Sequence, residues 1–394
     1  MKDRNHLANI GLIHQVHVIE NGLIDIPMLQ VLKPDGTLHP ESELPKITKQ
    51  CALKILQTMQ YIRLLDERMV AAQRQGRISF YLACTGEEAS TVASAAALEP
   101  QDMIMSQYRE QGALAYRGFT SKEFMDQMFS NQNELNKGRQ MPIHYGSKVL
   151  NFMTISSPLG TQIPQASGYA YGQKMAGLEA VTICYFGEGA ASEGDFHAGL
   201  NMAAVLNCPV IFFCRNNGYA ISTPSEEQFK GDGIASRGLG YGVRTIRVDG
   251  NDVLAVYTAT QKARQIALEH QCPVLIEAMT YRLAAHSTSD DPTSYRSKDE
   301  EKSWHLKDPV IRFETWMQCK GWFDEKQNLT FIERTRQEIL KELKLAEQVP
   351  ICSIDQIIED VYDTPPWHLK AQLKELKTHI DMYPDAYPKT SGRL

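Results

Sequence analysis

The sequence predicts an α/β protein whose doubly wound, mostly parallel sheet carries helices on both faces. Four apolar runs of strand length lie in the middle of the chain: residues 180–186, 209–215, 245–248 and 273–280. Their near-continuous Val, Ile and Phe content is typical of parallel strands buried on both faces. Amphipathic helical patterns separate the runs, and this repeated strand–helix–strand order predicts that the strands lie parallel in one sheet.

The 394 residues are enough for one large core with extensions. Residues 1–45 are punctuated by Pro and Gly with little periodicity, and we expect an N-terminal arm there. Residues 46–300 form the predicted α/β domain, and residues 301–394 a helical C-terminal extension packed on the same domain. A helical pattern over residues 47–75 places these apolar side chains on one face: Ala52, Ile55, Leu56, Met59 and Ile62.

Composition narrows the class of protein. The formal charge is −6, from 41 Lys and Arg against 47 Asp and Glu, which gives no electrostatic basis for binding nucleic acid or an anionic membrane surface. No apolar run approaches the ~18 residues of a membrane-spanning helix. The eight cysteines are scattered without a CxxC pair, as is typical of reduced core thiols. The N-terminus has no signal-peptide or transit-peptide pattern. We therefore expect a cytoplasmic bacterial protein, or a mitochondrial matrix protein whose presequence has been removed.

Polar residues follow two of the predicted strands where each strand ends. Glu188 lies between two glycines after the first strand, and Asn217 and Tyr219 follow the next one. Glu188 and Asn217 are 29 positions apart (217 minus 188), about one βαβ unit, so both groups are expected at the same edge of the sheet. Carboxylate, amide and carbonyl oxygens suit Mg²⁺, which commonly shares its coordination shell with phosphates.

The same stretch carries features that favour a phosphate group. Gly187 and Gly189 allow the backbone to approach an anion closely. Ser192 followed by Asp195 resembles a capping box, and the N-terminus of the helix it starts favours negative charge in the same crevice. Arg215 adds a fork of N–H donors. Together these residues predict Mg²⁺ bridging a diphosphate.

A Gly-x-Gly followed about thirty residues later by Asn-Asn resembles the thiamine diphosphate signature, with Glu188 where Asp is usual. Longer segments also match in order, among them KGRQMPIHYG (137–146), TISSPLGTQIPQA (154–166), CRNNGYAISTP (214–224) and HSTSDD (286–291). From about residue 45 to 380 the chain resembles the alpha subunit of the decarboxylating component of branched-chain 2-oxo acid dehydrogenase complexes.

This resemblance implies the thiamine diphosphate-binding fold and an activity. The activity is oxidative decarboxylation of branched-chain 2-oxo acids such as 3-methyl-2-oxobutanoate, with reductive acylation of the lipoyl group of an acyltransferase component. The implied cofactors are thiamine diphosphate, Mg²⁺ and a monovalent cation such as K⁺. The alternative is the alpha subunit of pyruvate dehydrogenase, because Cys84 and Thr85 depart from the family pattern and could alter the size of the substrate pocket.

The resemblance also implies roles for individual residues. The predicted Mg²⁺ ligands are Glu188, Asn217 and the backbone of Tyr219. The predicted cofactor-binding residues are Tyr108, Arg109, Ser157, Leu159, Gly187, Glu188, Gly189, Ala190, Arg215, Asn217 and His286. The predicted monovalent-cation residues are Ser156, Pro158, Thr161 and Gln162. Gln107 and Tyr108 are expected to face the substrate, and His286 to act in proton or acyl transfer. His144 and Arg139 remain undecided between pocket and structural roles.

The resemblance places part of the site on another chain. In thiamine enzymes, a glutamate from a second domain activates the cofactor, whereas this chain carries one α/β domain. We therefore expect a beta subunit in an α₂β₂ heterotetramer and inactivity of the isolated chain. Two other interpretations stay open. One is a non-catalytic scaffold, which the intact site residues disfavour, and the other is a self-contained transketolase-like enzyme, which the length disfavours.

Overall fold

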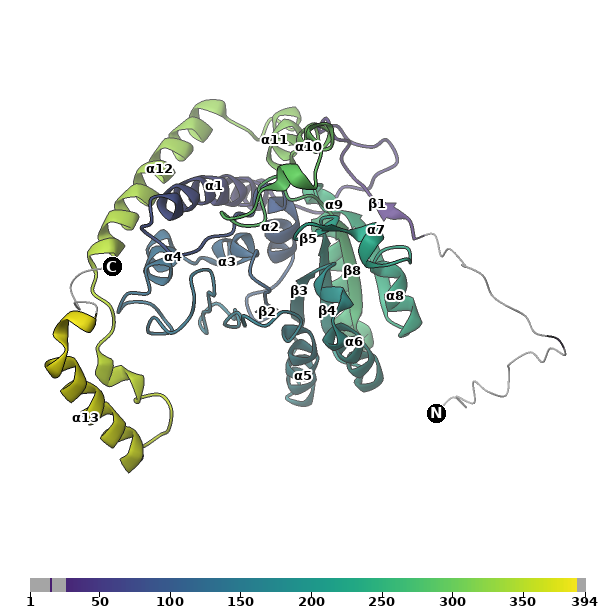
Figure 1. Cartoon of the computed structure of the whole chain (residues 1–394). Coiled ribbons are helices and arrows are strands. Elements are labelled where there is room, and N and C mark those ends of the chain that lie inside the picture. The colour runs from purple at the N-terminus through teal and green to yellow at the C-terminus, as the bar shows by residue number, and fades with distance from the viewer. Residues whose placement is uncertain (1–14, 16–25, 388–394) are drawn as a thin grey trace.

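The computed structural model describes residue 15 and residues 26–387. Its centre is a six-stranded sheet in the order β1-β7-β8-β4-β3-β2, and all neighbouring strands are parallel (Figure 1). The strands are β1 (Met28–Leu29), β2 (Met103–Met105), β3 (Thr182–Gly187), β4 (Val210–Asn216), β7 (Arg244–Asp249) and β8 (Val274–Met279). The predicted doubly wound α/β fold is confirmed, and the four predicted strands correspond to β3, β4, β7 and β8.

Helices cover both faces of the sheet, and the sheet lies between two hydrophobic clusters: Ile183 and Tyr185 of β3 belong to one, Cys184 and Phe186 to the other. The helices of the domain are α1 (Lys49–Arg74), α2 (Glu88–Ala96), α3 (Gln111–Arg117), α4 (Ser121–Met128), α5 (Gln162–Met175), α6 (Gly194–Leu206), α7 (Ser225–Gln228), α8 (Ala235–Gly240), α9 (Val253–His270) and α10 (Lys298–His305). A small hairpin of β5 (Tyr219–Ala220) and β6 (Thr223–Pro224) follows β4. The crossover through α6 joins β3 to its neighbour β4, so the residues after both strands lie at one edge.

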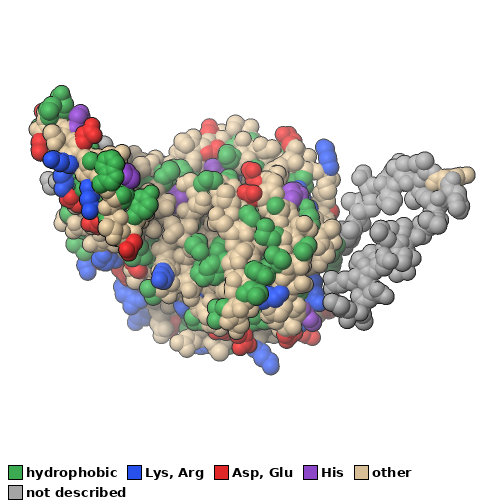
Figure 2. Space-filling model, turned by 90° about the horizontal axis from the view of Figure 1, so that it is seen from below, with side chains coloured by type: hydrophobic (Ala, Val, Ile, Leu, Met, Phe, Trp, Pro, Cys, Tyr) green, Lys and Arg blue, Asp and Glu red, His purple; other side chains and the backbone are tan. Residues whose placement is uncertain are grey.

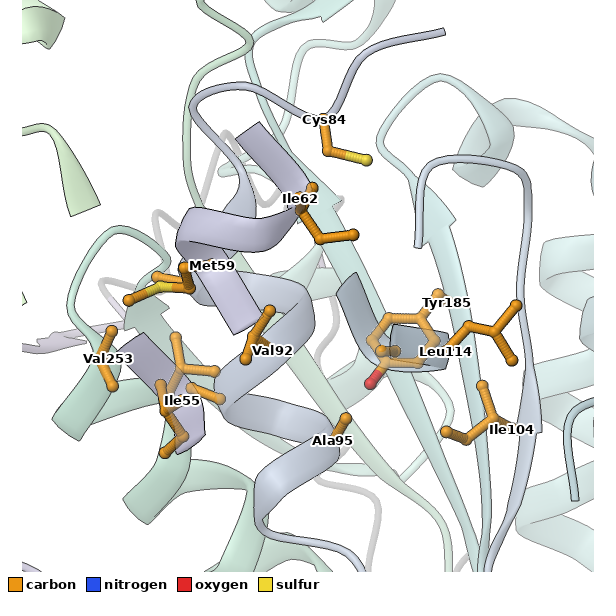
Figure 3. Packing of buried hydrophobic residues seen from close by; sticks show 14 of the residues in the cluster. Ile55, Met59, Ile62, Cys84, Val92, Ala95, Ile104, Leu114, Tyr185 and Val253 are labelled. Atoms are coloured by element: carbon orange, nitrogen blue, oxygen red, sulfur yellow. The ribbon is translucent and has the colours of Figure 1, made fainter. Parts of the chain in front are cut away.

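The larger cluster lies where α1 and α2 pack together beside the sheet (Figure 3). Ile55, Met59 and Ile62 from α1 face Val92 of α2, and the ring of Tyr185 reaches the same core from β3. All five side chains are buried. The predicted apolar face of the 47–75 helix is therefore the face that enters the core, because residues three and four apart share one side of a helix.

The end of the predicted N-terminal arm belongs to the sheet. β1 pairs with β7 as an edge strand, and the backbone N–H groups of Val31 and Leu32 donate to the carboxylate of Asp252 at 2.7 and 2.6 Å. Val31 and Leu32 are buried. Residues 1–14 and 16–25, the rest of the arm, lie outside the described residues, so the arm itself stays a prediction.

The C-terminal extension is helical. α11 (Pro309–Cys319) and α12 (Glu325–Gln348) pack against α1, and α12 also packs against α4. α13 (Trp367–Met382) instead stands away from the body, beside the segment that leads to it (Figure 1), where Lys377 Nζ lies 2.5 Å from Asp355 Oδ1. Within the described part of the chain, no helix is long and apolar enough to cross a membrane.

Candidate active site

A cavity of about 220 Å³ lies at the carboxyl ends of β3 and β4. The predicted site residues that line it are Gln107, Tyr108, Arg109, Leu159, Gly187, Glu188, Gly189, Ala190, Arg215, Asn217, Tyr219 and His286. Glu193, Ala220, Ile221 and Arg282 also line it and were not predicted. The structure thus gathers residues from widely separated positions of the sequence at the topological switch of an open sheet, the usual place for a ligand.

The acidic side of the cavity has an unsatisfied oxygen. The Glu188 side chain is 1% exposed, and its Oε2 accepts the backbone N–H of Asn217 at 3.3 Å. Its Oε1 is buried and has no hydrogen-bond partner among the described residues. A buried carboxylate oxygen without a donor is costly unless it binds a cation, so this site fits a divalent metal. No group of three His, Cys, Asp or Glu side chains that could hold a metal ion occurs in the described residues.

The Asn-Asn pair points its two amides in different directions. Asn216 donates to Glu277 on β8 at 2.8 Å, whereas Asn217 lines the cavity. The Oδ1 of Asn216 accepts the N–H of Gly218, and the Oδ1 of Asn217 accepts that of Tyr219, both at 3.1 Å. These two overlapping turns wind the loop after β4, and only the second asparagine is left at the predicted metal position.

Burial makes the charge on Glu188 sensitive to pH. Burial, together with the nearby charge of Glu87, raises the pKa of Glu188 from 4.5 to about 7, although Arg215 opposes the shift. The folded chain therefore holds this proton more tightly than the unfolded chain does. The contribution of this group to stability is present below about pH 4.5 and is lost as the pH rises to about 7.

This shift predicts the pH dependence of metal binding. Only the ionised carboxylate is a good Mg²⁺ ligand, so the apparent Mg²⁺ affinity is expected to rise about tenfold per pH unit up to about pH 7 and then to level off. Calorimetric Mg²⁺ titrations at several pH values check this expectation. A flat profile between pH 5 and pH 8 contradicts it.

The opposite side of the cavity is cationic. Arg109 Nη2 donates to the carbonyl of His286 at 3.1 Å, and Arg282 Nη1 lies 3.2 Å from His286 Nδ1. An arginine can only donate, so Nδ1 is the acceptor and Nε2 carries the proton. Burial, followed by the charges of Arg109 and Arg282, lowers the pKa of His286 to about 4, so the ring is neutral near pH 7. An anion such as a diphosphate would compensate this concentration of positive charge.

The loop before α3 is held by one carboxylate. Glu110 Oε2 accepts the backbone N–H groups of Gln107, Tyr108 and Arg109 at 2.9, 3.0 and 3.1 Å. Its Oε1 accepts from Arg215 Nε at 2.6 Å. Arg215 therefore lines the cavity with its guanidinium already bonded to a carboxylate, and its contact with a diphosphate stays a prediction. Glu110 ends the segment QYRE (107–110), which resembles the family, but its role depends on where the loop meets β4.

The start of α6 differs from the expectation. The predicted capping box at Ser192 and Asp195 is wrong, because α6 begins after Glu193 and no side chain caps it. Ser192 ends a short 3₁₀ helix (Ala190–Ser192), and its hydroxyl accepts from Gln228 at 3.1 Å. Gly189 is needed for a second reason as well: a Cβ there would lie 2.8 Å from the Cβ of Ala220, so the β5 hairpin could not pack so closely.

The segment from 156 to 162 contributes one predicted residue, Leu159, to the lining of the cavity. Ser157 Oγ lies 2.9 Å from His144 Nε2. His144 Nδ1 lies 3.1 Å from the carbonyl of Pro142, which only accepts, so Nδ1 carries the proton and the Ser157 hydroxyl donates to Nε2. His144 thus supports a predicted site residue. Arg139 instead pairs with Asp360 at 2.7 Å and ties down the C-terminal segment.

The predicted monovalent-cation residues lie together in part. The Thr161 hydroxyl donates to the carbonyl of Pro158 at 3.0 Å and lies 3.3 Å from Ser156 Oγ. Gln162 is buried, and its amide nitrogen donates to the carbonyl of Tyr185 at 3.1 Å. These contacts group the four residues beside β3, and the cation itself stays a prediction.

Cys84 and Thr85, which depart from the family pattern, lie outside the cavity. Cys84 is buried, and its thiol donates to the side-chain oxygen of Gln111 at 2.7 Å and to the carbonyl of Arg109 at 3.2 Å. Thr85 lines a separate groove beside α1, together with Ala284. Neither side chain lines the cavity that holds the predicted site residues. Their effect on the site is therefore indirect, through the position of Arg109.

Comparison with known proteins gives matches along most of the chain. The family described as "Dehydrogenase E1 component" matches residues 56–355. The chain is 50% identical over 365 residues to the Caenorhabditis elegans protein named "2-oxoisovalerate dehydrogenase subunit alpha, mitochondrial", covering 92% of this chain and 84% of that relative. Proteins of the same name from Homo sapiens and Dictyostelium discoideum are 48% and 51% identical, over 97% and 92% of this chain and 86% and 83% of the relatives. The chain belongs to the dehydrogenase E1 component family.

Proposed function

We propose that the chain is the alpha subunit of a branched-chain 2-oxo acid dehydrogenase and binds thiamine diphosphate and Mg²⁺ in the cavity after β3 and β4. The observation that carries the proposal is the cavity, which Glu188, with its unsatisfied oxygen, lines together with the guanidinium groups of Arg109 and Arg282. The names of the relatives support the branched-chain substrate, because 2-oxoisovalerate is 3-methyl-2-oxobutanoate.

Glu188, Asn217 and the carbonyl of Tyr219 hold Mg²⁺ in this proposal. The backbone N–H groups of Gly189 and Ala190 bind the diphosphate together with the cationic side chains opposite. Thiamine diphosphate, when bound, supplies the electron sink that no side chain provides for loss of CO₂ from a 2-oxo acid. The protein holds the cofactor, orients the substrate and keeps water out.

The side chains near the substrate have fixed hydrogen-bonding roles. The side-chain oxygen of Gln107 accepts from Gly187 N at 2.9 Å, so its NH₂ group is left as the donor for a substrate. The Ser157 hydroxyl donates a hydrogen bond to His144. The lone pairs of its oxygen are left to accept from an amino group such as that of the aminopyrimidine. Neutral His286 presents Nε2–H and can hold or move a proton. The cluster at 156–162 binds a monovalent cation.

An exposed apolar face supports a partner subunit. These side chains of α5, α6 and the turn after α5 are exposed: Tyr169, Tyr171, Met175, Leu178, Met202, Val205 and Leu206. Figure 2 shows hydrophobic side chains gathered on this lower face of the body. Val205 is 70% exposed, and exposed apolar side chains gathered on one face are typical of a protein interface. We assign it to a beta subunit of an α₂β₂ heterotetramer, which delivers its product to a lipoyl-bearing acyltransferase component. A cytoplasmic location stays a prediction, and the relatives are named as mitochondrial.

The test is the substrate preference of the assembled complex. We expect the chain, co-produced with a beta subunit, to oxidise 3-methyl-2-oxobutanoate in preference to pyruvate. The reaction is expected to require thiamine diphosphate and Mg²⁺, with an artificial electron acceptor as the readout. The isolated chain is the control and is expected to be inactive. Preference for pyruvate would favour the alternative, the alpha subunit of pyruvate dehydrogenase. Activity of the isolated chain would contradict an active site that a beta subunit completes.

A further inference from the structure

We propose that Glu87 is a positioning residue of the metal site, which turns the side-chain amide of Asn217 so that its oxygen faces the cation. The inference rests on the proposed function and adds a residue that no sequence motif marks. Glu87 lies immediately before α2, about 130 residues before Asn217 (217 minus 87). Its side chain is 0% exposed, so every polar contact it makes is inside the protein.

The contact with Asn217 is directional. Glu87 Oε1 lies 2.9 Å from Asn217 Nδ2. An ionised carboxylate only accepts hydrogen bonds, so the NH₂ end of the amide must face Glu87. The Oδ1 end then lies on the other side, where it accepts the N–H of Tyr219 at 3.1 Å and keeps a lone pair for a metal ion. Supporting contacts of this kind set the orientation of metal ligands in proteins generally.

The charge environment keeps Glu87 an acceptor. Glu87 Oε2 pairs with Arg215 Nη1, while Arg215 Nη2 pairs with Glu110 at 2.5 Å. An arginine can only donate, so one oxygen of Glu87 is committed to the arginine as an acceptor and the other to the amide.

The neighbouring Asn216 is also held by a buried carboxylate, but that contact stabilises the fold and does not act on the cavity. Asn216 donates to Glu277 at 2.8 Å, on β8. Glu277 also accepts the backbone N–H groups of Ile234 and Ala235 and pairs with Arg247, so it holds the fold of that region. Each asparagine of the pair thus has its own buried carboxylate, and only the contact with Glu87 acts on the amide that lines the cavity.

Glu87→Gln is the informative substitution. The oxygen of the new amide is expected to stay with Arg215, because an arginine must face an acceptor. Its NH₂ group then meets the NH₂ group of Asn217, and the clash is relieved when the Asn217 amide rotates and presents nitrogen to the metal. We expect the half-saturating Mg²⁺ concentration to rise about 10- to 100-fold, the range typical of residues that orient a metal ligand.

The matched control is Glu110→Gln. It removes the same charge from the other carboxylate partner of Arg215, and the bonds of the Glu110 side chain go to Arg215, Ser106 and the backbone of residues 107–109. It is expected to alter the thiamine diphosphate requirement and not the Mg²⁺ requirement at saturating cofactor. Glu87→Asp keeps the charge with a shorter reach and is expected to fall between wild type and Glu87→Gln.

The experiment titrates Mg²⁺ into the full alpha–beta complex at saturating thiamine diphosphate and follows binding by calorimetry, so turnover is not needed. The thermal unfolding temperature of the metal-free complex separates lost positioning from lost folding. An unchanged Mg²⁺ requirement in Glu87→Gln, or an equal rise in Glu110→Gln, overturns the inference. If Glu87→Gln does not assemble, an unchanged requirement in Glu87→Asp overturns it. A wild-type complex that binds cofactor without a divalent cation would instead contradict the proposed function.

Discussion

A Glu188→Gln complex is expected to bind thiamine diphosphate about 100-fold or more weakly than the wild type at a fixed Mg²⁺ concentration. Glu188 supplies a charged oxygen that has no partner among the described residues, and glutamine replaces that charge with an uncharged amide. Losing a metal ligand is expected to exceed the 10- to 100-fold cost that is typical of residues that merely orient one. Calorimetric titration of thiamine diphosphate into the metal-loaded complex measures the loss.

Glu193→Gln is the control for this experiment. Glu193 lines the same cavity, but its side chain is exposed, and no predicted cofactor contact depends on it. The change in the free energy of thiamine diphosphate binding is expected to stay within about 0.5 kcal/mol, the size of effect typical of surface substitutions. Higher Mg²⁺ concentrations are expected to restore little binding to Glu188→Gln and much of it to Glu87→Gln, since only the second variant keeps the ligand. Cofactor binding with an unaltered Mg²⁺ dependence in Glu188→Gln would remove the basis of the metal assignment.

A His286→Asn complex is expected to lose turnover by about 10²- to 10⁴-fold, the usual contribution of a positioned acid–base group. Arg282 fixes the neutral ring with its proton on Nε2, and asparagine keeps a donor of similar size without the ability to exchange a proton. Binding of thiamine diphosphate is expected to weaken much less than turnover. Two rates separate the steps: decarboxylation with an artificial acceptor, and transfer to a lipoylated acyltransferase domain.

His270→Asn serves as the comparison variant, because His270 is exposed at the end of α9, away from the cavity. It is expected to leave both rates close to wild type. A His286→Asn complex that keeps turnover within tenfold of wild type would assign His286 to cofactor binding alone. Equal losses in both rates would place its action before the transfer step.

Four strands of the sheet could be predicted from the sequence, because each is marked by the residue types within its own segment. The apolar runs that became β3, β4 and β8 are almost wholly buried, so their composition alone marks them, whereas β7 is only partly buried. β1 and β2, of two and three residues, are too short to carry such a pattern. The capping interpretation at Ser192 was wrong because a 3₁₀ turn, invisible in residue type, delays the start of α6.

The sequence by itself determined the fold class, the family resemblance and which residues follow β3 and β4. These depend on residue type and spacing along the chain, and parallel strands bring their carboxyl ends together without further information. Only the tertiary structure decided the supporting contacts: Glu87 on Asn217, Glu110 on the 107–109 loop, His144 on Ser157 and Arg282 on His286. Two of these four contacts, Glu87 with Asn217 and His144 with Ser157, join separate segments, and the two local contacts take their meaning from the burial around them. Hydrogen-bond direction and buried charge are properties of positions in space, which no pattern along the chain records.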